Sequence, residues 1–295
     1  MVYALSAKEG GKMTKHAAWS RRKFVGATAG ILTGVGVVGG GLWLRGRGSP
    51  VETGEEDREA GANLPPRVVG LRTSGGNFRF DPAGLRIEPG TDVIFLNMGD
   101  FHTATAFHPD YGHLLGGDVP LRIPDGAEPW HSGMLGLTDG TQFEHTFTAE
   151  GVHDYFCQPH YGFGMVGRII VDAGPNRPLP VARPLSELPK GAQKQMPAVE
   201  TIMGPAGRSF EWAARLNGVL YLVANGMEAG AAAQRAVDEM EADETLRELV
   251  KAAGKRHALA AATDRFLEGV VNAGDYEDLV ARSDAVKAEL RANHL

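Results

Sequence analysis

The 295-residue sequence contains a single cysteine, Cys157. An intrachain disulfide is therefore excluded, and the cysteine count does not indicate whether the protein meets an oxidising compartment. Positive charge is scarce after the N-terminal region. Eight of the 30 Lys and Arg residues but only one of the 36 Asp and Glu residues precede Ser49, so the remaining chain carries a net charge of about −13. Such an acidic chain is a poor partner for nucleic acid. We expect it instead to meet a basic surface on a partner protein or to live in salty surroundings.

Residues 1–48 resemble a twin-arginine export signal. The motif is Ser20-Arg21-Arg22-Lys23-Phe24-Val25. The residues that continue it, 25–44, are glycine-rich and carry no charged side chain. About 20 such residues are just enough to span a bilayer as a helix. The basic residues before the stretch keep its N-terminal side in the cytoplasm. As a signal or as an anchor, the segment places the rest of the chain outside the cytoplasm.

Two absences bear on whether this segment is removed. The sequence has no Ala-x-Ala cleavage site after the uncharged stretch, and no cysteine there that could carry a lipid. We therefore favour a retained membrane anchor over a cleaved signal, and expect an extracytoplasmic protein tethered to the cell membrane. Residues 46–66 are rich in Gly, Glu and Arg without a periodic apolar pattern, which indicates a flexible tether over residues 49–66.

Short β-type stretches separated by turn residues fill residues 67–172. The predicted strands are residues 67–71, 77–80, 85–87, 92–97, 103–107, 142–147, 152–156 and 166–171. Repeated short strands of this kind favour a β-sandwich. His145 and His153 lie on these strands beside polar neighbours, so we expect both at the surface. The Gly- and Pro-rich segment between residues 109 and 140 is a long insertion of a kind that is often functional.

Residues 155–165 read Tyr-Phe-Cys-Gln-Pro-His-Tyr-Gly-Phe-Gly-Met, so Cys157, His160 and Met165 share one short loop. A second imidazole is available in His102, which follows the apolar strand at residues 92–97. A thiolate, two imidazoles and a distant thioether form the soft ligand set that suits redox copper. Zinc also accepts Cys and His, but it has no use for a thioether, so Met165 argues against zinc.

This pattern resembles the cupredoxins, the blue-copper family that includes plastocyanin, pseudoazurin and halocyanin. The residues that match its early strands and its ligand hairpin are Phe80, Pro82, Leu85, Ile87, Pro89, Gly90, Val93, Phe95, Asn97, Phe147, Gly151, Tyr155, Cys157, Pro159, His160, Met165, Gly167 and Val171. The resemblance implies a Greek-key β-sandwich over residues 67–172, with His102, Cys157, His160 and Met165 as ligands of one type 1 copper ion. Many members have an asparagine at the position of Thr103, where it ties the two ligand loops together.

The resemblance also implies a function. Cupredoxins of this kind carry single electrons between redox partner proteins, and electrons pass through the exposed edge of the histidine on the Cys-to-Met loop. That role falls to His160, with Pro159, Tyr161 and Phe163 as the surrounding patch. Copper enzymes that share the fold use His-x-His pairs or a histidine beside the cysteine, and this chain has neither. We therefore expect no enzyme, and keep a copper delivery or storage module as the alternative.

Further histidines gather in and before the long insertion. His108, Asp110, His113 and His131 are candidates for a second metal site, although their spacing matches no known metal frame. Solvated or locally hydrogen-bonded histidines are the simpler interpretation. His108 is also the alternative to His102 as the first copper ligand. We prefer His102 because it follows Asn97 at about the family distance.

The C-terminal part changes character twice. Residues 173–197 contain six prolines, which favour an extended linker between domains. Residues 198–295 then show helical periodicity, with predicted helices from a Ser209 cap to Gly226 and over residues 231–240, 243–253, 257–271 and 276–290. We expect a small all-α domain of unrecognised family. Its two histidines have no partner at a metal-binding spacing, so a packing or docking role is the simplest interpretation.

Overall fold

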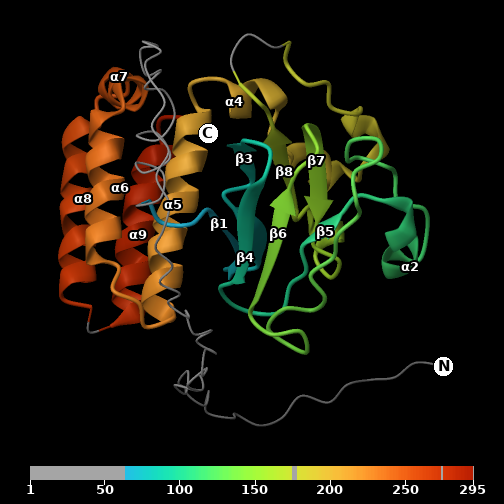
Figure 1. The fold of residues 1–295 in the computed structure, drawn as a ribbon, viewed down its shortest axis with the longest axis horizontal. Coiled ribbons are helices and arrows are strands. Elements are labelled where there is room, and N and C mark those ends of the chain that lie inside the picture. Colours follow the sequence, from blue (N-terminus) through green and yellow to red (C-terminus); the bar gives the residue numbers. More distant parts are fainter. Residues whose placement is uncertain (1–63, 175–177, 274, 295) are drawn as a thin grey trace, which may run out of the picture. The chain divides into compact units, whose positions relative to one another are not determined.

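The computed structural model describes residues 64–174, 178–273 and 275–294 (Figure 1). These residues belong to one compact unit. The predicted signal or anchor at residues 1–48 and residues 49–63 of the predicted tether lie outside the described residues. Within the described part, no helix combines the length and apolar character that crossing a bilayer requires.

Two four-stranded sheets form the β-sandwich that the sequence predicts. The first has the order β2-β1-β4-β6, and the second β3-β8-β7-β5. The bounds are β1 Val68–Ser74, β2 Asn77–Asp81, β3 Gly84–Ile87, β4 Thr91–Asn97, β5 Thr105–Ala106, β6 Gln142–Phe147, β7 Gly151–Phe156 and β8 Val166–Val171. The parallel pairs β1–β4 and β3–β8 and the exchange of strands between sheets give the cupredoxin-like topology. The fold class predicted for this part is confirmed.

The core between the sheets is built from alternate residues of the strands. Val69, Leu71 and Phe95 of the first sheet belong to the same buried cluster as Tyr155 and Ile169 of the second. The Tyr155 ring meets the Phe95 ring edge-on at a centroid distance of 5.4 Å. β-Branched and aromatic side chains fit a pleated, half-buried surface well, which explains why these short segments form strands.

The proline-rich segment is not extended throughout. It contains a 3-10 turn, Leu185–Glu187, and the helix α3, Lys190–Gln195, and α4 follows at Val199–Met203. Leu188, Ala192 and Met196 recur every four residues and pack on the second sheet. Pro189 stands just before α3, where a proline can begin a helix instead of breaking it. The expectation of an extended linker is therefore wrong for these residues.

Two buried arginines hold this segment against the sheet. The Asp154 carboxylate on β7 accepts hydrogen bonds from Arg168 Nε at 2.7 Å and from Arg122 Nε at 3.0 Å. Arg168 also donates to the carbonyl of Pro197, and Arg122 to the carbonyls of Arg183 and Pro184. These charges are paired and hydrogen-bonded, as burial requires.

The expectation that His153 lies at the surface is wrong. Its side chain is buried, its ring meets Phe147 edge-on, and its Nε2 donates to the carbonyl of Ala149 at 2.7 Å. The prediction relied on its polar neighbour Asp154, which is itself buried between two arginines. His145 is half-buried, because the Trp130 ring of the long insertion stacks beside it at 5.2 Å.

The C-terminal part is helical, as predicted. Its main helices are α5 Gly207–Ala224, α6 Gly230–Ala242, α7 Glu244–Ala252, α8 Arg256–Val271 and α9 Tyr276–Arg291. They share a buried cluster that includes Leu216, Val237 and Phe266. Ser209 does not cap α5. The helix begins two residues earlier, and the Ser209 hydroxyl donates to the carbonyl of Ala206 inside the first turn.

Helix α5 covers the outer face of the first sheet (Figure 1). Val68, Ile94 and Leu96 form a buried cluster on this face, and Tyr221 of α5 packs against it. The approach is close, because a Cβ atom on Gly218 of α5 would lie 2.1 Å from the carbonyl oxygen of Pro66. With α3 and α4 on the second sheet, both sheets are covered on their outer faces.

Candidate metal centre

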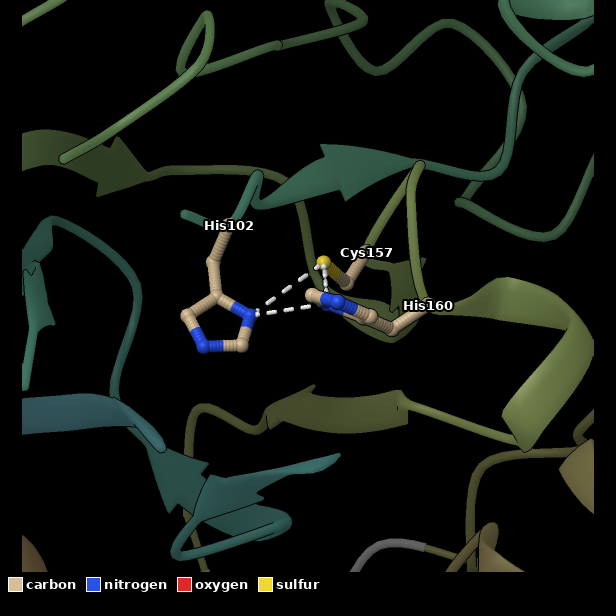
Figure 2. A group of neighbouring side chains, drawn as sticks. All are labelled: His102, Cys157 and His160. Atoms are coloured by element: carbon tan, nitrogen blue, oxygen red, sulfur yellow. Dashed lines mark hydrogen bonds between the residues drawn. The ribbon is translucent and has the colours of Figure 1, made fainter. Parts of the chain in front are cut away.

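Three predicted ligands converge in the sandwich (Figure 2). Cys157 Sγ lies 3.6 Å from His102 Nδ1 and 3.5 Å from His160 Nδ1, and the two nitrogens are 3.1 Å apart. His102 and Cys157 are fully buried, and His160 is 6% exposed. In the described part of the chain, this is the one group of His, Cys and acidic side chains whose ligand atoms are close enough to share a metal ion.

The spacing of these atoms fits a metal ion. A triangle with the three measured sides has its centre about 2.0 Å from each corner, close to the roughly 2.0–2.3 Å bonds that imidazole nitrogen and thiolate sulfur make to zinc, a comparable first-row metal. Buried groups normally have hydrogen-bond partners. Two imidazole nitrogens that face each other and a sulfur are explained more simply as a donor set for a cation.

His102 is oriented by contacts on both sides. Its backbone exchanges hydrogen bonds with Leu135 of the long insertion, at 3.0 and 2.8 Å. Its ring Nε2 lies 3.1 Å from the hydroxyl of Thr73 at the end of β1. A proton on Nε2 donated to this hydroxyl leaves the Nδ1 lone pair free for a metal, which is how metal-bound histidines are usually fixed in one tautomer.

Thr103 links the two ligand segments. Its backbone N–H donates to Cys157 Sγ at 3.4 Å, and its hydroxyl oxygen accepts the backbone N–H of Gln158 at 2.8 Å. Thr105 lies 3.1 Å from the same hydroxyl and 2.8 Å from His131 Nδ1. The hydrogen bonds that an asparagine makes in many family members are thus replaced by a threonine network.

The loop after Cys157 is closed by its backbone. His160 N–H donates to the Cys157 carbonyl, Met165 N–H to the His160 carbonyl, and Cys157 N–H to the Met165 carbonyl. The loop contains a 3-10 turn, Tyr161–Phe163, and ends at Gly164 with φ +94°, a left-handed conformation that favours glycine. Met165 is fully buried in the same core cluster as Cys157, and the backbone hydrogen bond between the two places the fourth predicted ligand beside Cys157.

Burial sets the protonation of the ligands. It raises the pKa of the Cys157 thiol to about 12. Burial, followed by repulsion from His160, lowers the pKa of His102 to about 4, and burial lowers that of His160 as well. At neutral pH the imidazoles are therefore neutral and ready to bind a metal. The thiol must lose its proton when a metal binds, since the thiolate is the ligand.

Aromatic side chains surround the outer edge of His160. The ring of Phe78 on β2 stacks on it at 3.8 Å with an interplanar angle of 10°. Phe101 and Phe163 lie at 5.9 and 6.4 Å and are 40% and 65% exposed. Sequence analysis missed Phe78 and Phe101. The position of Phe101 directly before His102 is the signal that could have pointed to it.

The predicted patch residues divide between two environments. Phe163 lies beside His160 and is exposed. Tyr161 instead packs against Phe107 and Phe156, at 5.7 and 5.4 Å, in the cluster beneath α3. Pro159 is half-buried.

The four residues of the predicted second site are only partly brought together: His108 Nδ1 lies 3.4 Å from Asp110 Oδ2. His108 Nδ1 accepts the backbone N–H of Asp110, and His113 Nδ1 donates to the Asp110 carbonyl. His131 instead bonds to Thr105. Within the described residues these four side chains form no group of metal-ligating atoms. These contacts agree with the simpler interpretation that the histidines are locally hydrogen-bonded. The triangle with Cys157 and His160 contains His102 and not His108, the alternative first ligand.

Comparison with known proteins gives the same family. Residues 68–172 match the model of the copper-binding proteins of the plastocyanin/azurin family. A plastocyanin of Fritillaria agrestis is 29% identical over 117 residues, which are 38% of this chain and 66% of that protein. The pseudoazurin of Methylorubrum extorquens is 33% identical over 97 residues, 33% of this chain and 54% of that protein.

The halocyanin of Natronomonas pharaonis is also 33% identical, over 106 residues that are 36% of this chain and 56% of that protein. The chain thus spans about half to two thirds of the length of these three relatives. The matched residues contain the complete set His102, Cys157, His160 and Met165, which fits one type 1 copper ion. Residues 68–172 therefore form a cupredoxin domain of the plastocyanin/azurin family, with copper as its cofactor.

Proposed function

We propose that this protein is a type 1 copper electron-transfer protein that passes single electrons between redox partners outside the cytoplasm. The buried triangle of His102, Cys157 and His160 is the observation that carries the proposal. Copper bound there would supply a one-electron Cu(I)/Cu(II) couple. Cys157 would hold it through its thiolate, His102 and His160 through their imidazoles, and Met165 through its thioether.

The surrounding chain is suited to this task because it fixes the ligands independently of the metal. Thr73 and Leu135 hold His102, and Thr103 ties the Cys157 segment to it. Ligands that are held in place move little when the charge of the metal changes, and a small rearrangement favours fast electron transfer. A site meant for metal release would gain from mobile ligands instead.

The edge of His160 is the proposed route for electrons. Phe101 and Phe163 expose apolar surface beside it. Apolar surface holds water weakly, so a partner protein would cover it at little cost and approach the copper centre closely. The acidic balance of the chain after residue 48 supports a partner with a basic docking surface. Residues 1–48, which resemble a twin-arginine signal, support export in the folded state and attachment to a membrane.

The test is the visible and electron paramagnetic resonance spectrum of the full chain loaded with Cu(II). We expect an intense thiolate-to-copper absorption and a narrow copper hyperfine splitting that Cys157→Ala abolishes and the control His113→Ala, at an exposed histidine, retains. Reversible reduction by one electron per copper should follow. A pale spectrum that survives the loss of Cys157 would contradict electron transfer at this centre and would favour a copper delivery or storage module.

A further inference from the structure

A cavity of about 620 Å³ lies where β2, α3, the start of α5 and the end of α9 meet. Its volume falls within the roughly 300–1,000 Å³ that is usual for small-molecule sites. None of the four copper ligands lines it. Its charged and imidazole-bearing lining residues are Arg79, Asp81, Lys194, Lys287, Arg291 and His294.

Positive charge predominates in this lining. Arg79, Lys194, Lys287 and Arg291 are cationic, and the carboxylate of Asp81 is the one acidic group among the lining residues. Both carboxylate oxygens of Asp81 already contact a cation. Lys287 Nζ lies 3.2 Å from its Oδ2, and Arg291 contacts its Oδ1. Burial alone would raise the pKa of Asp81, but the attraction of Lys287, Arg291 and Arg72 outweighs burial and keeps it ionised.

The charges just behind the lining do not remove the surplus. Arg72 contacts Asp81 at 3.2 Å and Asp284 at 2.5 Å, and Asp284 also lies 3.0 Å from Lys287. Among the described residues, the lining and the two side chains behind it together hold five cations and two carboxylates. A charge surplus at a partly buried site is unfavourable unless an anion offsets it, and a dianion would offset most of this one.

Two polar groups in the wall have no partner. Among the described residues, the half-buried Arg79 side chain makes no hydrogen bond or ion pair. Burial lowers the pKa of its guanidinium, and the attraction of Asp81 offsets this only in part. His294 Nε2 is buried and likewise has no hydrogen-bond partner in the described part. A bound oxyanion would give the Arg79 guanidinium an acceptor, and it would accept from His294 Nε2 in the tautomer that carries the proton there.

The rest of the wall is largely apolar. It is formed by Phe80, Pro82, Ala83, Met196, Pro197, Phe210 and Ala213. A pocket with one cationic side and one apolar side suits a molecule that carries an anionic group on a carbon skeleton. Arginine matches the geometry of phosphate through its planar fork of donors.

We propose that this cavity binds a small phosphate monoester. Arg79 and Arg291 donate to the phosphate oxygens, Lys194 adds a flexible charge at the rim, and the apolar wall contacts the organic part. The site is separate from the copper centre, and its existence does not depend on electron transfer.

The test is calorimetric titration of the copper-loaded full chain, at constant ionic strength, with glycerol 3-phosphate, inorganic phosphate and chloride as probes. We expect one molecule of glycerol 3-phosphate per chain, bound more tightly than inorganic phosphate, and no saturable binding of chloride. Arg79→Gln should weaken the binding about tenfold or more, as expected for a lost charge-assisted hydrogen bond.

Two further variants keep the result interpretable. Lys194→Gln changes an exposed side chain, so it should leave the fold intact and still weaken binding. Arg86→Gln removes an exposed strand arginine that pairs with Asp172 outside this cavity, and should bind as the wild type does. Absence of saturable binding by the ester, or unchanged affinity in both Arg79→Gln and Lys194→Gln, would overturn the proposal. Equal affinity for inorganic phosphate would overturn its organic part.

Discussion

At the residue scale, Thr103 shows how one side chain can join two ligand segments. We expect Thr103→Val to lower copper affinity about tenfold or more, because the hydroxyl that accepts the Gln158 N–H is lost while the side-chain volume is kept. Competition with a Cu(I) chelator measures the affinity. Thr148→Val, at an exposed position, is the control. Unchanged affinity in Thr103→Val would show that the backbone alone holds the two segments together.

His145 gives the stability a pH dependence. Burial, followed by repulsion from His153, lowers its pKa from 6.5 to about 4. The unfolded chain therefore takes up a proton near pH 6.5 that the folded state does not bind. This group leaves the free energy of unfolding unchanged above pH 6.5 and lowers it as the pH falls from 6.5 towards 4.

Between pH 7 and pH 5 we expect the free energy of unfolding of the copper-loaded protein to fall. His145→Gln should lose roughly 1 kcal/mol less than the wild type over this interval, after allowance for partial exposure of the ring. Urea unfolding at both pH values measures the two losses. Equal losses would mean that His145 titrates alike in the folded and unfolded states.

The ligands themselves could be predicted because their chemistry and spacing are local. Cys157, His160 and Met165 occupy a single loop, and only His102 had to be brought from elsewhere. The stacking of Phe78 on His160 could not be predicted in this way. It depends on how β2 is placed beside the ligand loop, which is a tertiary contact between residues 82 positions apart in the sequence.

At the scale of elements, α3 supports the ligand loop from behind. A Cβ atom on Gly164 would lie 2.6 Å from the backbone carbon of Gly191 in α3, and φ at Gly164 is +94°. Gly164→Ala should therefore destabilise the protein by more than about 1 kcal/mol and should shift the thiolate-to-copper band, because Met165 comes next in the chain.

The reciprocal substitution is the matched control. A Cβ atom on Gly191 meets Gly164 at 3.4 Å, an ordinary contact, and alanine is the better helix former by roughly 0.5–1 kcal/mol. Gly191→Ala should keep the spectrum and the melting temperature or raise the latter. Similar spectra and stabilities in both variants would contradict a supporting role for α3.

The elements with a clear period were predictable, and those defined by packing were not. The strand at residues 142–147 and the helices near residues 257–271 and 276–290 follow from alternation or helical periodicity alone. Helix α3 is short and enclosed by prolines, and its stability depends on the sheet beneath Leu188, Ala192 and Met196. Sequence composition does not reveal such a support.

At the scale of the whole molecule, a buried charge cluster joins the sandwich to the helices. Asp81 of β2 contacts Lys287 and Arg291 of α9. We expect Asp81→Asn to lower the free energy of unfolding by about 3–5 kcal/mol, because Lys287 is fully buried and loses one of its two carboxylates.

Chemical denaturation measures this loss, and the visible spectrum should stay unchanged because Asp81 does not contact the copper ligands. Asp125→Asn, which removes an exposed carboxylate paired with Arg183, should change the stability by no more than about 0.5 kcal/mol. A loss as small as that in Asp81→Asn would show that the Asp81 carboxylate contributes little to holding the helices on the sandwich.

The two buried arginines that bind Asp154 have a consequence for proteolysis. By composition, residues 183–197 look like a hinge that a protease could open. Their carbonyl groups are instead bound by Arg122 and Arg168, whose charges are secured by Asp154. A protease must draw its substrate into an extended strand, and here that requires pulling two guanidinium groups away from a buried carboxylate. This stretch should therefore resist cleavage for as long as the sandwich stays folded.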